Sequence, residues 1–221
     1  MTNIRILNDM MGSGEAINLF AEDMYKDERN IDQSKVYLTE NTSIAYKKIY
    51  SDGHTIRDFL NILYCNSKKM KKVDKTYNVL VYLAGHGNDS VFKFQDRDWL
   101  CCEDLMAGIC FLSRICRKIL LIVDTCQAET MICREDLPSN VFAVTTSIKD
   151  ESSLSTIHSN YIGVSCIDNF IFYLSEAFKE SNSRTKLFDF FSCINNKPVG
   201  STISFSPYED FYLCDFFGNK F

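Results

Sequence analysis

Two runs of consecutive apolar residues stand out in the middle of the chain. Residues 79–84 are Val-Leu-Val-Tyr-Leu-Ala, and residues 119–123 are Ile-Leu-Leu-Ile-Val. Such continuous runs are typical of strands that are buried on both faces, because a strand with one wet face alternates apolar and polar residues. From similar apolar runs we predict three more strands, at residues 4–7, 141–145 and 211–217.

Other segments have apolar residues at the three- and four-residue spacing of an amphipathic helix. The first such stripe consists of Ile56, Phe59, Leu60 and Leu63. A second helix is predicted from about Asp98 to Cys116, and a short one around residues 16–20. The last stripe consists of Val164, Ile167, Ile171, Leu174 and Phe178. Strands that alternate with helices favour an α/β fold, with a mostly parallel sheet and helices on both of its faces.

Length and composition agree with a single domain. The chain has 221 residues, of which 46% are hydrophobic, and this is enough for one sizeable α/β core. Only three prolines and nine glycines are present, and no low-complexity tract marks a linker. We therefore expect residues 1–221 to form one domain.

Charge and cysteine usage exclude several classes of function. The net charge of −5 leaves no basic surface for nucleic acid, so no nucleic-acid partner is expected. Ten cysteines are present without any C-x-x-C spacing, so we expect no metal site, and no cofactor is expected either. No apolar stretch approaches the roughly 18 residues of a membrane span. The first nine residues show no apolar core of a secretory signal.

Candidate chemistry lies directly after the two central strands. Residues 85–87, Gly-His-Gly, follow the first strand, and residues 124–127, Asp-Thr-Cys-Gln, follow the second. Sheets of this kind bind ligands at the carboxyl ends of their strands. If the two strands are neighbours, their ends lie about 5 Å apart, and His86 and Cys126 can then act as base and nucleophile. The amide of Gly87 could donate to a developing oxyanion.

A plain structural interpretation competes with this one. One Cys among ten is usually a small buried hydrophobe, and a lone His is usually structural. Their positions at successive strand ends leave the two interpretations evenly balanced. A Cys/His metal site is the weaker alternative, because three or four ligands cannot be assembled. His54 and His158 lie in polar segments and are expected at the surface.

The motifs resemble the glycosylphosphatidylinositol (GPI) anchor transamidase branch of the legumain-like cysteine peptidases, which have a caspase-like fold. The resemblance rests on residues 81–87 (Val-Tyr-Leu-Ala-Gly-His-Gly), 92–96 (Phe-Lys-Phe-Gln-Asp) and 122–128 (Ile-Val-Asp-Thr-Cys-Gln-Ala). The second of these segments separates the transamidase branch from plain legumains. Further similar segments are residues 146–147, 150–153, 162–164 and 214–217. The likeness runs from about Ile4 to Phe217.

The resemblance implies a two-step acyl transfer. Cys126 would attack the carbonyl of a small residue near the carboxyl terminus of a precursor protein, and His86 would protonate the departing amine. The ethanolamine amine of the GPI glycolipid would then open the thioester. The resemblance implies an oxyanion hole made by the backbone amides of Gly87 and Cys126. It also implies a pocket for the small residue. The residues that would line this pocket are Asp124, Gln127, Thr146 and Ser147.

The resemblance also implies partners and a location. The partners would be the other subunits of a transamidase complex, precursor proteins with carboxyl-terminal GPI signals, and the GPI glycolipid. The complex would lie in the membrane of the endoplasmic reticulum, with this subunit on the lumenal side.

The chain departs from the family pattern in several places. It begins at what matches the family's second strand, so we expect it to be truncated, without the first strand, its His-orienting Asn and the signal peptide. The strand at residues 4–7 would then lose its neighbour or shift. No Cys follows that strand, Asn88 replaces the second Gly of the family's G-H-G-G, and no membrane span follows at the carboxyl end. Two alternatives therefore stay open, namely a hydrolytic legumain- or caspase-like endopeptidase and a non-catalytic scaffold subunit.

Overall fold

The computed structural model describes residues 5–6, 55–66, 73–94, 98–159, 164–208 and 210–217. In these ranges the largest sheet has five strands in the order β1–β2–β6–β7–β10. Its strands are β1 (Arg5–Ile6), β2 (Asn78–Ala84), β6 (Lys118–Asp124), β7 (Val141–Thr145) and β10 (Ser204–Phe205). Neighbouring strands are parallel from β1 to β7, and β10 is antiparallel to β7. The predicted mostly parallel sheet is confirmed.

The three apolar runs form the centre of this sheet. Every residue of β7 is buried, and so is every residue of β6 except Lys118. The strand predicted at residues 4–7 is β1, which pairs directly with β2. Polar backbone groups in such a dry layer need partners, and the parallel ladders supply them.

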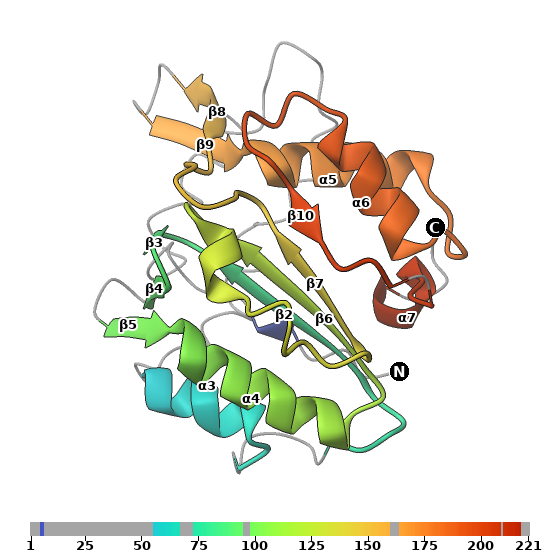
Figure 1. Cartoon of the computed structure of the whole chain (residues 1–221). Coiled ribbons are helices and arrows are strands. Elements are labelled where there is room, and N and C mark those ends of the chain that lie inside the picture. Colours follow the sequence, from blue (N-terminus) through green and yellow to red (C-terminus); the bar gives the residue numbers. More distant parts are fainter. Residues whose placement is uncertain are drawn as a thin grey trace, which may run out of the picture.

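Helices cover both faces of the sheet (Figure 1). Helices α3 (Ile56–Leu63) and α4 (Cys102–Ile115) lie on one face. Helices α5 (Asn169–Glu180), α6 (Leu187–Asn195) and α7 (Leu213–Phe217) lie on the other. Because successive side chains of a strand point to opposite faces, each central strand contributes to two separate cores.

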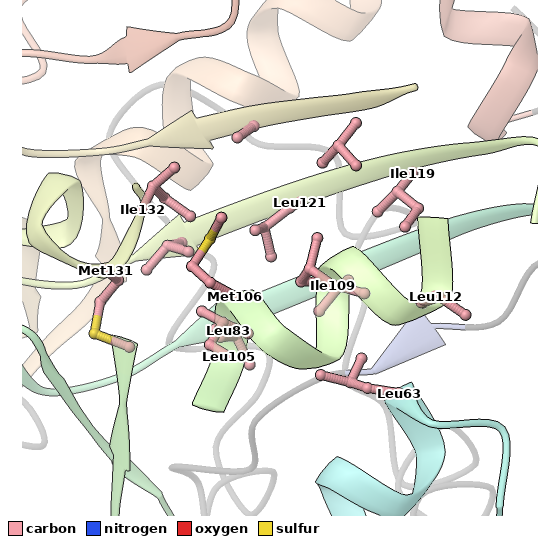
Figure 2. Close-up of a cluster of buried hydrophobic side chains, with 14 of the residues drawn as sticks. Leu63, Leu83, Leu105, Met106, Ile109, Leu112, Ile119, Leu121, Met131 and Ile132 are labelled. Carbon is pink, nitrogen blue, oxygen red and sulfur yellow. The ribbon is translucent and has the colours of Figure 1, made fainter. Parts of the chain in front are cut away.

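The core under α3 and α4 is mainly aliphatic. Side chains of α4 meet those of β2 and β6, as Figure 2 shows for Ile109, Leu83 and Leu121. The core under α5, α6 and α7 is rich in aromatic rings, and Phe142 of β7 lies 6.0 Å from Phe191 and 5.5 Å from Phe211 between ring centroids. The two cores hold the sheet rigidly from both sides, so the carboxyl ends of its strands are well positioned.

Helix α3 begins where its sequence predicts. Thr55 is the N-cap, and its hydroxyl oxygen accepts a hydrogen bond from the Asp58 amide at 3.3 Å. The Asp58 carboxylate accepts one from the Thr55 amide at 2.9 Å. This reciprocal capping box satisfies two amides that would otherwise lack partners at the helix start.

The helix predicted from Asp98 begins four residues too early. Residues Asp98–Cys101 form β5, which pairs with β4 (Val91–Phe94), and β4 pairs in turn with β3 (Gly87–Asn88). The apolar stripe of the prediction was correct, since α4 uses it from Cys102 onward. The start was wrong because Asp98–Cys101 pair with β4 in a hairpin, and the apolar stripe of the helix does not show where that pairing ends.

Two further predictions were also wrong. Residues Val164–Asp168 form strand β9, paired with β8 (Ser155–Ser159), and α5 begins only at Asn169. Residues 211–217 are not a strand: Tyr212 makes an isolated bridge with Lys186, and α7 follows. The Asp215 carboxylate accepts a hydrogen bond from the Tyr212 amide at 3.1 Å, and this favours the helical turn.

Some predicted features lie outside the described residues. These are the short helix at residues 16–20, His54, and the side chain of His158. Within the described part of the chain, no helix has the length and apolar character that crossing a bilayer requires.

Candidate active site

Strands β2 and β6 are adjacent and parallel, so the turns that follow them leave the sheet side by side. The register pairs Ala84 with Asp124, the last residues of the two strands. The Gly85 amide then donates to the Asp124 carbonyl at 3.1 Å. The residues after this point are His86 on one strand and Cys126 on the other. The condition on which the proposed pairing depended, that the two strands are neighbours, is therefore met.

Gly87 packs directly against the turn that contains Cys126. A Cβ atom at Gly87 would lie 2.6 Å from the Thr125 hydroxyl oxygen and 2.8 Å from its methyl carbon. It would also lie 3.0 Å from the carbonyl oxygen of Cys126. Only glycine permits such a close approach of two backbones. The Gly-His-Gly segment is thereby held against the Thr125–Cys126 segment.

Cys126 lies at a sharp, left-handed turn. It is partly buried, and the next residue, Gln127, has φ 54° and ψ 31°. A short 3₁₀ helix, η3 (Ala128–Met131), follows. A residue other than glycine with this backbone conformation is uncommon, and such conformations cluster at functional sites.

Buried hydrogen bonds hold this turn from below. The Ser147 hydroxyl donates to the Thr125 carbonyl at 2.7 Å and accepts from the Ala128 amide at 3.0 Å. The Gln127 amide donates to the Glu151 carbonyl at 2.9 Å. Because these contacts lie on both sides of Cys126, the backbone that bears the thiol is firmly positioned.

His86 is exposed, and its position depends on a hairpin. The His86 carbonyl accepts a hydrogen bond from the Lys93 amide at 2.8 Å, next to the β3–β4 pairing. Across the described ranges, no hydrogen bond joins the His86 imidazole to another residue. Within those ranges, the backbone contacts of its turn are what set the position of the imidazole.

Asp124 is a buried carboxylate with three hydroxyl donors. Only 3% of the residue is exposed. Tyr82 donates to it at 2.7 Å, Thr146 at 2.9 Å and Ser153 at 3.2 Å. Burial raises the pKa of the Asp124 carboxyl to about 6; the charge of Asp168 also raises it, and the three hydrogen bonds lower it. The Asp124 side chain therefore ties β2, the end of β7 and the loop at residue 153 together beneath the site.

The structure brings all seven residues singled out in the sequence to one edge of the sheet. Asp124, Thr146 and Ser147 form a buried layer, with Thr146 and Ser147 fully inaccessible. Gln127 lies at the surface of that layer, and His86, Gly87 and Cys126 lie in the two turns above it. Their catalytic and pocket roles stay predictions.

Sequence reasoning missed four residues that shape this site. Tyr82 and Ser153 bind the Asp124 carboxylate, Asn88 binds the Gln127 side chain, and Glu151 binds the Gln127 amide. A tyrosine hydroxyl in an otherwise apolar strand could have signalled Tyr82, since a buried hydroxyl needs a partner. The other three contacts join distant segments and have no local signal.

No set of three or more His, Cys, Asp or Glu side chains in the described ranges could hold a metal ion. An imidazole and a thiol at neighbouring strand ends of an α/β sheet are the arrangement expected of a peptidase-like enzyme with a cysteine nucleophile. More particularly, the chain belongs to the Peptidase C13 family, whose model matches residues 4–202. The caspase- and legumain-like fold expected of that family is the one observed.

Curated relatives narrow the comparison within the family. The chain is similar to the GPI-anchor transamidase of Saccharomyces cerevisiae, with 28% identity over 209 residues that cover 86% of this chain and 50% of the relative. It is 33% identical over 180 residues to the putative GPI-anchor transamidase of Drosophila melanogaster, covering 73% and 49%. It is 27% identical over 227 residues to the human GPI-anchor transamidase, covering 91% and 56%. The resemblance to the transamidase branch is confirmed, and the chain spans about half the length of these relatives.

Proposed function

We propose that this chain is a cysteine-dependent GPI-anchor transamidase subunit, with Cys126 as nucleophile and His86 as base. The observation that supports this most is the register of β2 with β6, which ends both strands at the same level just before His86 and Cys126. The similarity to proteins named GPI-anchor transamidase supports the choice of reaction.

The reaction begins when His86 takes the thiol proton and the Cys126 sulfur attacks the carbonyl of a precursor protein. The backbone amides of Gly87 and Cys126 donate to the oxyanion that forms. The carbon–nitrogen bond then breaks, and the departing amine takes the proton from His86. This leaves the precursor as a thioester on Cys126.

The second half of the reaction repeats these steps with a new amine. The ethanolamine amine of GPI attacks the thioester carbonyl and gives its proton to His86. The carbon–sulfur bond breaks, the sulfur takes the proton from His86, and the Cys126 thiol is restored as the amide product leaves. A small residue at the cleavage site would fit beside the buried layer that Asp124, Thr146 and Ser147 form.

Location and partners follow from the proposed reaction. Because the acceptor is a membrane glycolipid, the subunit would work in a membrane complex with the other transamidase subunits, on the lumenal side of the endoplasmic reticulum. Its protein substrates would be precursors with carboxyl-terminal GPI signals.

A second candidate is a hydrolytic endopeptidase with the same nucleophile. The matching family model describes peptidases, and this observation favours it. Water would then open the thioester, and the product would be a free acid in place of an amide. The products therefore separate the two functions.

The test is complementation of cells depleted of their own transamidase subunit. We expect Cys126→Ala and His86→Ala to abolish the display of GPI-anchored proteins at the cell surface. Cys133→Ala is the matched control, because that thiol is exposed and lies on a different segment. Full rescue by Cys126→Ala would show a scaffold role and contradict the proposal. A free-acid product formed at the same rate with and without an amine acceptor would favour the endopeptidase.

A further inference from the structure

Three residues other than glycine have a left-handed backbone in loops around the site. They are Ser90 with φ 61°, Gln127 with φ 54° and Asp150 with φ 65°. Each such conformation costs free energy, so it persists only where surrounding contacts hold it. The contacts that link these three loops converge on one residue, Gln127, through its side chain and its backbone carbonyl.

The Gln127 amide group binds two other loops at once. Its nitrogen, Nε2, donates to Asn88 Oδ1 at 2.7 Å. Its oxygen, Oε1, accepts from the Asp150 amide at 3.4 Å. A third group, the Thr130 hydroxyl, donates to the Gln127 carbonyl at 2.8 Å and accepts from the Ser90 amide at 2.8 Å. The turn after β6 is thus joined by two separate polar links to the β3–β4 hairpin, which directly follows His86.

These links lie next to the reacting residues. Asn88 is two residues after His86, and Gln127 directly follows Cys126. Since the His86 imidazole has no hydrogen-bond partner within the described residues, its distance from the thiol depends on how the two turns are held. The shortest direct side-chain link between those turns is the one from Gln127 to Asn88.

We propose that the Asn88–Gln127 hydrogen bond is a positioning clamp that sets the separation of His86 and Cys126. Gln127 then acts through the turn that it braces, and it is a positioning residue. This inference rests on the proposed function, because it assigns a role in the Cys–His chemistry. It also differs from a role for Gln127 in contacting the substrate, and the two can be separated by experiment.

The clamp depends on a residue at which this chain departs from the family pattern. Asn88 stands where the G-H-G-G motif has its second glycine, and glycine has no side chain that could accept the bond. Asn88 Oδ1 also accepts from the Asp89 amide at 2.9 Å, so the acceptor is itself held in place. Asn88→Gly therefore removes the clamp without adding any atom to the site.

A double-mutant cycle on the full chain tests the clamp. Asn88→Asp keeps an acceptor for Gln127 and should change the rate of acyl transfer to Cys126 by no more than about twofold. Gln127→Glu removes the donor. The rate should then fall by only about threefold, because the Asn88 amide can turn and donate to the new carboxylate. The combination puts two carboxylates together and should lower the rate about 30-fold, well beyond the product of the single effects. A double variant that equals that product would overturn the proposal.

The kinetic parameter that changes separates a clamp from a substrate contact. For Asn88→Gly we expect kcat to fall about tenfold with KM unchanged, since the Cys–His geometry is affected and substrate binding is not. A rise in KM at constant kcat would assign Asn88 and Gln127 to the substrate pocket and contradict the clamp.

A second readout does not depend on the transamidase reaction. The rate at which iodoacetamide alkylates Cys126 at neutral pH, measured by mass spectrometry of the Cys126 peptide, reports its pairing with His86. Asn88→Gly should lower this rate toward that of His86→Ala. Asp89→Asn, which removes the exposed 3.1 Å ion pair with Lys149 and keeps an oxygen acceptor for the Ser90 hydroxyl, should not. If the wild-type chain alkylates in this pattern but forms no thioester, the proposed function fails and the clamp stands. Equal alkylation rates in wild type and Asn88→Gly would overturn the clamp.

Discussion

The turn that bears Cys126 and the turn that bears His86 are held in different ways. Beneath Cys126 lies a buried polar layer, in which the Ser147 hydroxyl bonds to the backbone on both sides of the thiol. The His86 turn is exposed, and it is held by the short β3–β4 hairpin and by the Gln127 side chain. The thiol position is therefore decided by the core of the sheet, and the imidazole position by contacts near the surface.

This difference has a consequence for function. A change beneath Cys126 should affect folding and chemistry together, because the same buried groups serve both. A change beside His86 should affect the chemistry with little effect on folding.

The largest effect is expected where the two turns touch. Gly87→Ala would place a Cβ atom 2.6 Å from the Thr125 hydroxyl oxygen and so push the His86 turn away from Cys126. A displacement of about 1 Å at a reacting group can lower a rate about 100-fold, and we expect a loss of that order in acyl transfer.

Two variants control this experiment. Thr125→Ala combined with Gly87→Ala removes both nearest atoms and should restore part of the activity. Gly108→Ala adds a methyl group 2.7 Å from the Leu63 side chain in the aliphatic core. It should lower the free energy of unfolding by about 1–3 kcal/mol while the folded protein stays active. Activity of Gly87→Ala equal to wild type would show that the two turns are not held together by this contact.

The next effect concerns the layer beneath Cys126. Ser147→Ala removes a fully buried hydroxyl and leaves the Thr125 carbonyl and the Ala128 amide without this partner. We expect the free energy of unfolding to fall by about 2 kcal/mol in denaturant titrations. Ser192→Ala is the control, because that hydroxyl bonds only to the Phe188 carbonyl on a helix surface, and we expect a change of no more than about 0.5 kcal/mol. If both variants lost a similar free energy of unfolding, the buried layer would contribute no more to stability than a surface hydroxyl does, and the contrast would fail.

The smallest effect is a dependence of stability on pH. The folded-state pKa of Asp124, about 6, lies above the ordinary value of 3.8, so the folded protein holds this proton more tightly than the unfolded chain does. The Asp124 contribution to stability is therefore greatest below pH 3.8, falls as pH rises toward 6, and is constant above that. Between pH 5 and pH 7 we expect the free energy of unfolding of wild type to fall by about 1 kcal/mol relative to that of Asp124→Asn.

A second variant sharpens the same measurement. The negative charge of Asp168 is one cause of the raised pKa of Asp124. In Asp168→Asn the decline in stability should therefore move to lower pH. Identical pH profiles for wild type and Asp124→Asn would mean that this carboxyl does not titrate in the range.

Much of the fold could be predicted from local pattern. The strands at residues 79–84, 119–123 and 141–145 are buried on both faces, as their continuous apolar runs predict. Helix α3 could be predicted from its apolar stripe. The capping box of Thr55 and Asp58 marks its start. The positions of His86 and Cys126 just after two such strands then located the candidate site.

Other elements were not predicted, because they depend on contacts that a helical stripe or a short apolar run does not record. Strand β5 exists through its pairing with β4, and β9 through its pairing with β8. Strand β10 has only two residues and depends on β7, more than 50 residues earlier. Residues 211–217 contain an apolar run like that of a strand, yet the bond from the Tyr212 amide to Asp215 turns them into a helix.

The amino-acid sequence by itself determined which strands form the centre of the sheet and which reactive side chains follow them. The reason is that a strand buried on both faces is a continuous apolar run, and the residues at its end come next in the chain. Only the tertiary structure decided which groups surround those side chains. Residues 22 to 42 positions apart in the chain are joined in the Asp124 network, in the contact of Gly87 with Thr125 and in the bond from Gln127 to Asn88. Such contacts depend on how the strands are ordered in space, and no local spacing of residues records that order.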